Sequence, residues 1–248
     1  MEVNFLQKIV GRILKADKEF GFFEKNDIIG VGVSGGKDSL ILLEALGRIK
    51  KFLNFNLKLF AITVDVGFFK KDQQFKSIEK ICEKYDISHI VKKTKIKEVV
   101  FEHKKQKNPC SLCSTLRKGA LNEIAKEKGC NKVAFGHHLD DVVETFFMNL
   151  FMCGQINCFK PITYFSRQQI YLIRPLIFVL EEQIKKVLKR LKYIPIKNLC
   201  PKDKDSYRQT IKNFLTKQQK KDKGFKKRIF NAIRKNGKNG WGFVKQNS

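Results

Sequence analysis

The alternation of apolar runs with amphipathic segments predicts a fold of strands and helices. Buried strands are predicted where the apolar runs are nearly continuous, at Ile28–Val33, Leu57–Val66, Ile87–Val91 and Lys132–Phe135. Between these runs, apolar residues recur at helical spacing, which predicts helices over 40–49, Gln74–Tyr85, Leu112–Lys128 and Asp140–Phe151. Apolar strands that alternate with helices are typical of a parallel sheet covered on both faces. We therefore expect an α/β fold that binds ligands beyond the carboxyl ends of its strands.

The pattern weakens after residue 160. It predicts a strand at Gln169–Ile173 and a helix at Leu180–Leu191, followed by basic, partly helical material. On this basis we divide the chain into an N-terminal helical segment (1–24), a main domain (25–200) and a basic C-terminal extension (201–248).

Charge adds a prediction about partners. Lys and Arg outnumber Asp and Glu by 51 to 24, and residues 201–248 alone hold 15 basic against 3 acidic residues. A positive field of this strength favours a polyanion, and nucleic acid fits better than a membrane because no segment has the pattern of an interfacial helix. No secretory signal or long apolar span is found in the sequence. We expect a cytoplasmic protein that contacts no membrane.

The turn Ser34-Gly35-Gly36-Lys37-Asp38-Ser39 joins the first predicted strand to a helix. Backbone N–H groups, the helix dipole and Lys37 converge there, so the turn suits phosphate. It is not a Walker A loop, because Val31 and Asp38 stand where that motif needs Gly and Ser or Thr. The turn resembles the SGGxDS signature of the PP-loop ATP pyrophosphatases, which have an adenine nucleotide alpha hydrolase-like fold. The resemblance implies ATP as co-substrate and adenylation of a second substrate with release of pyrophosphate.

A second turn, Gly136-His137-His138-Leu139-Asp140-Asp141, opens another helix after a strand. Aspartates at a helix start are often only caps. PP-loop enzymes that act on tRNA have a similar turn, which implies that Asp141, or else Asp140, holds Mg²⁺ or helps to activate the nucleophile. We also assign Gly136, and Val64 on the second strand, to the ATP-binding residues.

Seven cysteines without an export signal argue against a disulfide framework. Cys110 and Cys113 form a CxxC pair at the start of a helix, where thiolates are favoured. Such a pair also suits a redox dithiol or half of a zinc site, but the thioredoxin-like context is absent and Cys200 supplies only a third ligand. Three cysteines with one open position suit a [4Fe–4S] cluster.

The segments PCSLCSTLRKG, AFGHHLDDVVETFFMNLF, IRPL and IPIKNLC occur in this order and resemble the tRNA 2-thiocytidine synthetase (TtcA) family. The resemblance implies a tRNA sulfurtransferase that modifies cytidine 32, with the cluster on Cys110, Cys113 and Cys200. Related thiolases have a basic residue where Arg117 stands, so we assign catalysis to Arg117, Lys37 and Asp141. As partners we expect tRNA, a sulfur donor (sulfide or a persulfide from a cysteine desulfurase) and a second copy of the chain.

The chain departs from this family at Cys200: the family's third cysteine usually begins Cys-Gly-Ser-Gln, with another cysteine just upstream, whereas Pro-Lys-Asp-Lys-Asp follows Cys200 here. A sister tRNA 2-thiouridine synthetase, a tRNA(Ile)-lysidine synthetase-like ligase without a cluster, and a zinc-stabilised nucleic-acid-binding protein are the alternatives. We expect the C-terminal extension and the lysines of 92–107 to bind the tRNA backbone.

Overall fold

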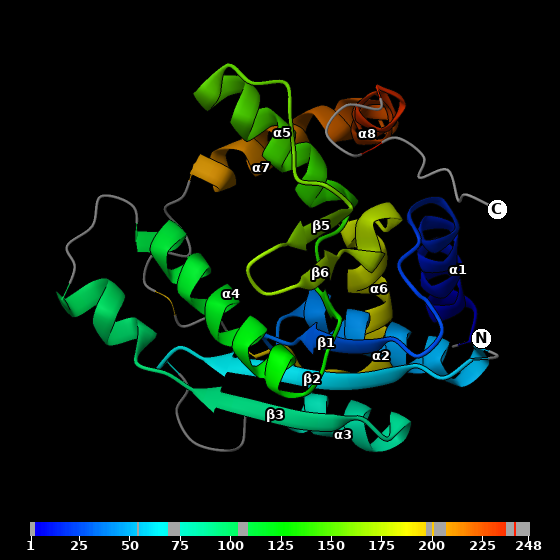
Figure 1. Cartoon of the computed structure of the whole chain (residues 1–248). Helices are drawn as coiled ribbons and strands as arrows, with labels where there is room; N and C mark the ends of the chain where they lie inside the picture. Colours follow the sequence, from blue (N-terminus) through cyan, green and yellow to red (C-terminus); the bar gives the residue numbers. More distant parts are fainter. Residues whose placement is uncertain are drawn as a thin grey trace.

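A six-stranded sheet forms the centre of the computed structural model, which describes residues 3–53, 55–68, 75–103, 109–196, 200, 207–236 and 241 (Figure 1). The strand order is β3-β2-β1-β4-β6-β5. The strands are β1 (Ile28–Gly32), β2 (Lys58–Asp65), β3 (Ser88–Lys93), β4 (Lys132–Ala134), β5 (Ile162–Phe165) and β6 (Ile170–Ile173). All pairings are parallel except that of β5 with β6. The predicted parallel α/β sheet is confirmed.

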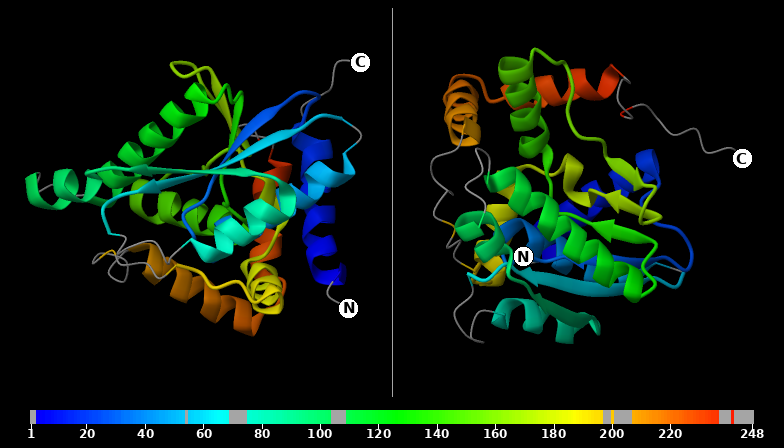
Figure 2. Two further views of the ribbon diagram at one scale, coloured as in Figure 1. Left: turned by 90° about the horizontal axis from the view of Figure 1, so that it is seen from below. Right: turned by 60° about the vertical axis from the view of Figure 1, so that its left-hand side comes forward.

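Helices cover both faces of this sheet, as Figures 1 and 2 show. The helices are α1 (Val3–Phe20), α2 (Lys37–Phe52), α3 (Lys76–Tyr85), α4 (Pro109–Glu127), α5 (Leu139–Cys153), α6 (Glu181–Leu191), α7 (Tyr207–Lys221) and α8 (Phe225–Lys235). On one face, Leu121 and Ile124 of α4 pack on Ile62 and Leu172. The larger hydrophobic core lies on the other face and is built from α1, α2, α3, α6 and the buried part of α5.

Three short elements were not predicted. They are the edge strand β5, a π-helix η2 (Glu98–His103) and a 3-10 helix η3 (Pro175–Phe178). Edge strand β5 is half-buried and carries little periodic signal, because only one of its edges pairs with the sheet. Within the described ranges, no helix is both long enough and apolar enough to cross a membrane.

The basic C-terminal helices pack on the same core as the sheet. Ile211 and Leu215 of α7 and Phe230 of α8 are buried in it, as is Trp241. The Trp241 indole donates to Phe159 O at 3.2 Å, and its ring meets Phe230 edge-on with the centroids 5.5 Å apart. Helices α7 and α8 and Trp241 therefore contribute to the main core, and the predicted division at 201–248 stays a prediction. The boundaries after 24 and 200 stay predictions, and 201–206 lie outside the described residues.

Candidate active site

The turn after β1 is anchored to the neighbouring strand and leaves a helix start open. Thr63 Oγ1 donates to Val33 O at 2.8 Å, which fixes the residue directly after β1. Gly35 then adopts a positive φ of 76°, and the Ser39 hydroxyl donates back to Gly36 O at 2.9 Å. Gly36 caps α2 without any side-chain hydrogen bond. The first N–H groups of α2 are thus available to an anion, as the sequence predicted.

Ile196, which is distant from this turn in the sequence, packs over it. Its N–H donates to Gly35 O at 2.9 Å. A Cβ built on Gly35 would lie only 2.2 Å from Ile196 Cδ1, so glycine is needed for both its φ and its size. The same segment runs on to Cys200, and therefore the phosphate turn and the third cysteine are linked through a short piece of backbone. Residues 197–199 lie outside the described part.

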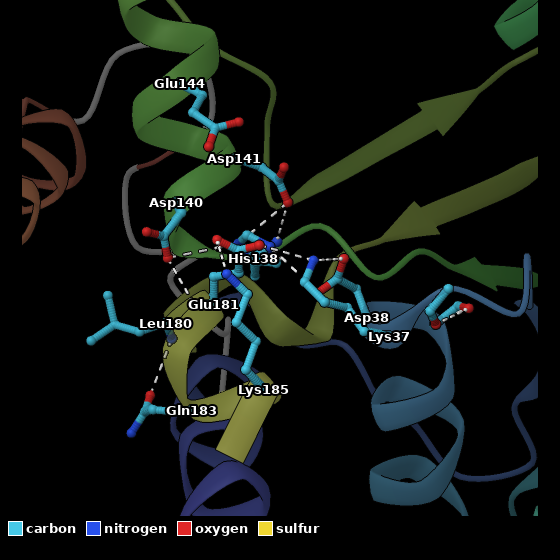
Figure 3. A network of polar contacts seen from close by, with 12 residues as sticks. Lys37, Asp38, His138, Asp140, Asp141, Glu144, Leu180, Glu181, Gln183 and Lys185 are labelled. Atoms are coloured by element: carbon cyan, nitrogen blue, oxygen red, sulfur yellow. Dashed lines mark hydrogen bonds and ion pairs between the residues drawn. The ribbon is translucent and has the colours of Figure 1, made fainter. Parts of the chain in front are cut away.

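The second turn lies directly against the first. A Cβ on Gly136 would come within 3.1 Å of the Asp38 carbonyl carbon, so the two backbones touch there. His138 is buried between the turns, with Nε2 3.5 Å from Asp38 Oδ1 and Nδ1 3.4 Å from Asp141 Oδ2 (Figure 3). The Asp141 carboxylate also accepts the His138 backbone N–H at 2.9 Å. The Asp38 and Asp141 carboxylates therefore flank one imidazole, and within the described residues neither Asp38 Oδ1 nor His138 Nδ1 makes a hydrogen bond.

A cavity of about 310 Å³ opens between the two turns and α4. Seven of the residues that we assigned from the sequence line it: Ser34, Asp38, Ser39, Val64, Arg117, Gly136 and Asp141. The other walls come from Gly32, Val33, Ile62, Ser114, Lys118, Leu121, Phe135 and His137. The lining does not include Gly35, Gly36 or Lys37. The carboxyl ends of β1, β2 and β4 therefore converge on a site with serines on one side and cations on the other.

Lys37 stands beside this cavity and is held by two carboxylates. Its Nζ lies 2.8 Å from Asp38 Oδ2 and 3.0 Å from Glu181 Oε1. Burial opposes the charge of Lys37, but the two carboxylates outweigh it and raise its pKa. Burial likewise opposes the charge of Glu181, yet Lys37 and Lys212 hold the pKa of that carboxyl well below its usual range. Both groups are charged at neutral pH.

The two candidate magnesium ligands have different surroundings. Asp140 is buried, its Oδ1 2.7 Å from Lys226 Nζ and its Oδ2 2.8 Å from the Glu181 N–H that donates to it. Both oxygens are occupied within the protein, and Asp140 does not line the cavity. Asp141 does line it, with a half-buried side chain. Of the two aspartates that the sequence offered, only Asp141 lines the cavity.

The three candidate cluster ligands lie near one another at the start of α4. Cys110 is exposed, whereas Cys113 and Cys200 are half-buried. Burial raises the pKa of Cys113, the nearby thiols of Cys200 and Cys110 add to this, and Arg117 opposes it. Within the described residues, no three His, Cys, Asp or Glu side chains are grouped closely enough to enclose a metal ion. The donor chemistry still fits an iron–sulfur group, because Cys110, Cys200 and Arg117 all act electrostatically on Cys113.

Three basic residues that the sequence did not single out lie at or near the cavity: Lys118 and His137 line it, and Arg174 lies close enough to act electrostatically on both. Lys118 follows Arg117 on α4. Burial lowers the pKa of Arg174 to about 10, and burial together with Arg174 lowers the pKa of His137 to about 4. His137 Nδ1 is buried and has no hydrogen-bond partner. The IRPL segment contains Arg174, but nothing local in the sequence indicates that it faces His137.

The chain is similar to a known family: a family model described as a PP-loop domain matches residues 5–219. A tRNA-cytidine(32) 2-sulfurtransferase of Geobacter sulfurreducens is 31% identical over 92% of this chain and 89% of its own length. A protein of the same name from Alcanivorax borkumensis is 35% identical over 93% of this chain and 82% of its own.

The fold has a solved counterpart. The U34-tRNA thiolase NcsA from Methanococcus maripaludis, solved with its [4Fe-4S] cluster, superposes with a TM-score of 0.75. The match covers 95% of this chain and 79% of the other at 24% identity. At this identity the likeness supports the architecture alone.

Proposed function

Since the chain belongs to the PP-loop family and, within it, to the tRNA-cytidine(32) 2-sulfurtransferases, we propose that it uses ATP to replace an oxygen of a tRNA cytidine with sulfur. The observation that carries this proposal is the shared cavity. Ser34, Ser39, Asp141 and Arg117 all line this cavity. Ser114, which follows Cys113 in the sequence, lines it as well. A nucleotide, a base and a sulfur carrier can meet only where such parts converge.

In the first step, the pyrophosphate of ATP lies on the turn 34–39, where N–H groups and the Ser34 and Ser39 hydroxyls face it. Asp141, which lines the cavity, would hold Mg²⁺, and the ion would neutralise phosphate charge when bound. The C2 oxygen of the cytidine attacks the α-phosphorus, and the bond to the β-phosphate oxygen breaks with release of pyrophosphate. Arg117 and Lys118 neutralise the negative charge that develops, because both line the cavity. The product is a cytidine whose C2 oxygen carries AMP.

In the second step, sulfide sulfur bonds to C2 and AMP leaves with the former C2 oxygen, so that 2-thiocytidine remains. A [4Fe–4S] cluster on Cys110, Cys113 and Cys200 supplies, when bound, a carrier for this sulfur. Arg117 lies one helical turn after Cys113 and favours the thiolate form of that ligand. The sulfur itself comes from sulfide, or from a cysteine desulfurase persulfide after a second thiol has reduced its outer sulfur to sulfide and formed a disulfide with the inner sulfur.

The tRNA partner is inferred from the family and from charge. Residues 201–248 hold 15 of the 51 basic residues, so we place the tRNA backbone across α7 and α8. The lysines of 92–107 belong to the same proposal, although 104–108 lie outside the described residues. We further infer a cytoplasmic homodimer, whose mass analytical ultracentrifugation would report.

The test pairs two exposed cysteines. We expect Cys110→Ala to abolish both the brown colour of anaerobically purified protein and the 2-thiocytidine of its tRNA, measured by nucleoside mass spectrometry. Cys153→Ala is the matched control, since Cys153 is equally a free, exposed cysteine but lies at the far end of α5. Unchanged 2-thiocytidine in Cys110→Ala would show that thiolation needs no cluster on Cys110, whereas lysidine in place of 2-thiocytidine would indicate the ligase.

The remaining alternatives have outcomes of their own. Loss of a thiouridine from the tRNA of a deletion strain would assign the chain to the sister uridine thiolases. A colourless zinc protein without ATP–pyrophosphate exchange would contradict the enzymatic proposal altogether.

A further inference from the structure

Acidic side chains beside the phosphate turn receive cations from both C-terminal helices. Lys226 of α8 donates to Asp140 Oδ1 at 2.7 Å, and Lys212 of α7 donates to Glu181 Oε1 at 3.1 Å. Asp140 is the second residue of α5 and Glu181 is the first residue of α6. Sequence separations of 86 and 31 residues mean that these contacts report tertiary packing and not local helix pairing.

The two acidic residues are themselves joined, and the chain of contacts ends on the phosphate-turn lysine (Figure 3). The Glu181 backbone N–H donates to Asp140 Oδ2 at 2.8 Å. The Glu181 carboxylate then holds Lys37 Nζ at 3.0 Å. A continuous path of polar contacts therefore runs from Lys226 through Asp140 and Glu181 to Lys37.

This path is buried enough to matter energetically. Lys226 is 8% exposed and Asp140 is 5% exposed, so neither charge can be satisfied by water if the other is removed. An uncompensated buried charge forces its surroundings to rearrange. The surroundings of Asp140 are the first turn of α6, because its second oxygen accepts the N–H of Glu181.

Glu181 can also release Lys37 without being left unpaired. Its carboxylate lies 3.1 Å from Lys212, 3.2 Å from Lys185 and 3.0 Å from Lys37. When phosphate oxygens approach Lys37, two ammonium groups still neutralise the carboxylate. The arrangement keeps Lys37 charged and close to the phosphate turn, yet leaves it free to turn towards ATP.

We propose that Asp140 and Glu181 are positioning residues through which α7 and α8 set the place of the Lys37 ammonium, so that docking of the C-terminal helices completes the ATP site. The inference rests on the proposed function, because it takes ATP as the ligand of the turn and tRNA as the ligand of α7 and α8. Contact of tRNA with these helices is then felt at the ATP site, and ATP binding strengthens tRNA binding by the same factor.

The test measures the affinity of the full, anaerobically purified chain for Mg·ATP by calorimetry, without tRNA. Lys226→Met should weaken binding about tenfold, the scale of one lost charge-assisted hydrogen bond. Lys227→Met is the matched control, because it removes the same charge from the exposed neighbouring position of α8 and should change the affinity less than about twofold.

A second comparison separates positioning from simple loss of stability. In a Lys37→Met background, adding Lys226→Met should weaken Mg·ATP binding no further, since the path then ends on no ammonium. Should Lys226→Met fail to fold, Glu181→Gln serves instead, because it keeps the shape and the N–H to Asp140 while it removes one of the two carboxylate charges at Lys37 and leaves Asp38. It too should weaken binding about tenfold.

Several results would overturn the inference. Equal Mg·ATP affinities for the wild type and Lys226→Met would do so while the proposed function stood. Additive losses in the Lys37→Met background, or tighter binding by Glu181→Gln, would show that the path does not position Lys37. A wild-type chain that binds no Mg·ATP would refute the proposed function as well.

Discussion

Gly35→Ala tests whether the phosphate turn depends on the segment that leads to Cys200. Gly35 has a φ of 76°, and its Cβ would meet Ile196 Cδ1 at 2.2 Å and Ile196 Cγ1 at 2.5 Å. Gly129, at the end of α4, has a φ of 70° and no atom within 4 Å of a built Cβ. The two glycines share the backbone cost of an alanine, but only Gly35 adds a clash.

The magnitudes follow from this difference. An alanine in the left-handed region costs about 1 kcal/mol at either position. At Gly35, displacing Ile196 costs about 2 kcal/mol more, because overpacking strains the site and the 2.9 Å hydrogen bond from Ile196 N to Gly35 O is lost. For a chain of this size, each kcal/mol lowers the melting temperature by about 2–4 °C.

Thermal unfolding under anaerobic conditions should therefore place Gly35→Ala below Gly129→Ala, and Mg·ATP titration should show lost binding only for Gly35→Ala. Adding Ile196→Ala removes Cδ1 and Cγ1 and leaves Cβ at 2.9 Å, so part of the stability should return. If the two glycine variants unfolded at the same temperature and bound ATP equally, Ile196 would not be seated on the turn.

Three further predictions concern buried charges. Lys132→Met leaves Asp27, 2% exposed and 2.8 Å away, without its cation, and urea unfolding should show a loss of about 3–5 kcal/mol with unchanged ATP affinity. Burial lowers the pKa of His137 from 6.5 to about 4, so the native state binds fewer protons between these values and stability rises with pH there. His137→Gln should flatten that slope by up to about 1.4 kcal/mol per pH unit in pH-dependent urea titrations. Burial raises the pKa of Cys113 and Arg117 opposes this, so Arg117→Met should slow iodoacetamide alkylation of Cys113 in cluster-free protein at pH 8, followed by mass spectrometry; faster alkylation would contradict the reasoning.

Local sequence signals predicted the central strands and helices well because each carried its own periodicity. The runs at 28–33 and 57–66 became β1 and β2, and the turn with its helix start followed the residues of the motif. Strand β5 was missed because its residues are half-buried or exposed and it pairs with only one antiparallel neighbour, so it has no run of apolar core positions. The burial of Trp241 against Phe159 could not be predicted either, since it depends on contacts 82 residues apart.

The site likewise has features that local sequence predicts and features that depend on distant contacts. Residues of the two turns could be assigned from the sequence because a motif keeps them adjacent, and the fold brings the turns together at one sheet edge. The choice between Asp140 and Asp141 could not be made in this way. It depends on Lys226 and on the Glu181 N–H, which come from distant helices.

Net charge of the C-terminal segment overstates what tRNA can use. Among the described residues, four of its cations face buried carboxylates outside the segment: Arg208 towards Glu144, Lys212 towards Glu181, Lys226 towards Asp140 and Arg234 towards Glu19. A fifth, Arg228, pairs with the exposed Asp222. A cation already paired at a buried carboxylate releases no phosphate counterion. The slope of log affinity for tRNA against log salt, about 0.7–0.9 per phosphate neutralised, should therefore reflect the exposed remainder of the 15 basic residues. Cations of this region that face buried carboxylates thus pair within the protein, and the exposed remainder stays available to tRNA phosphates.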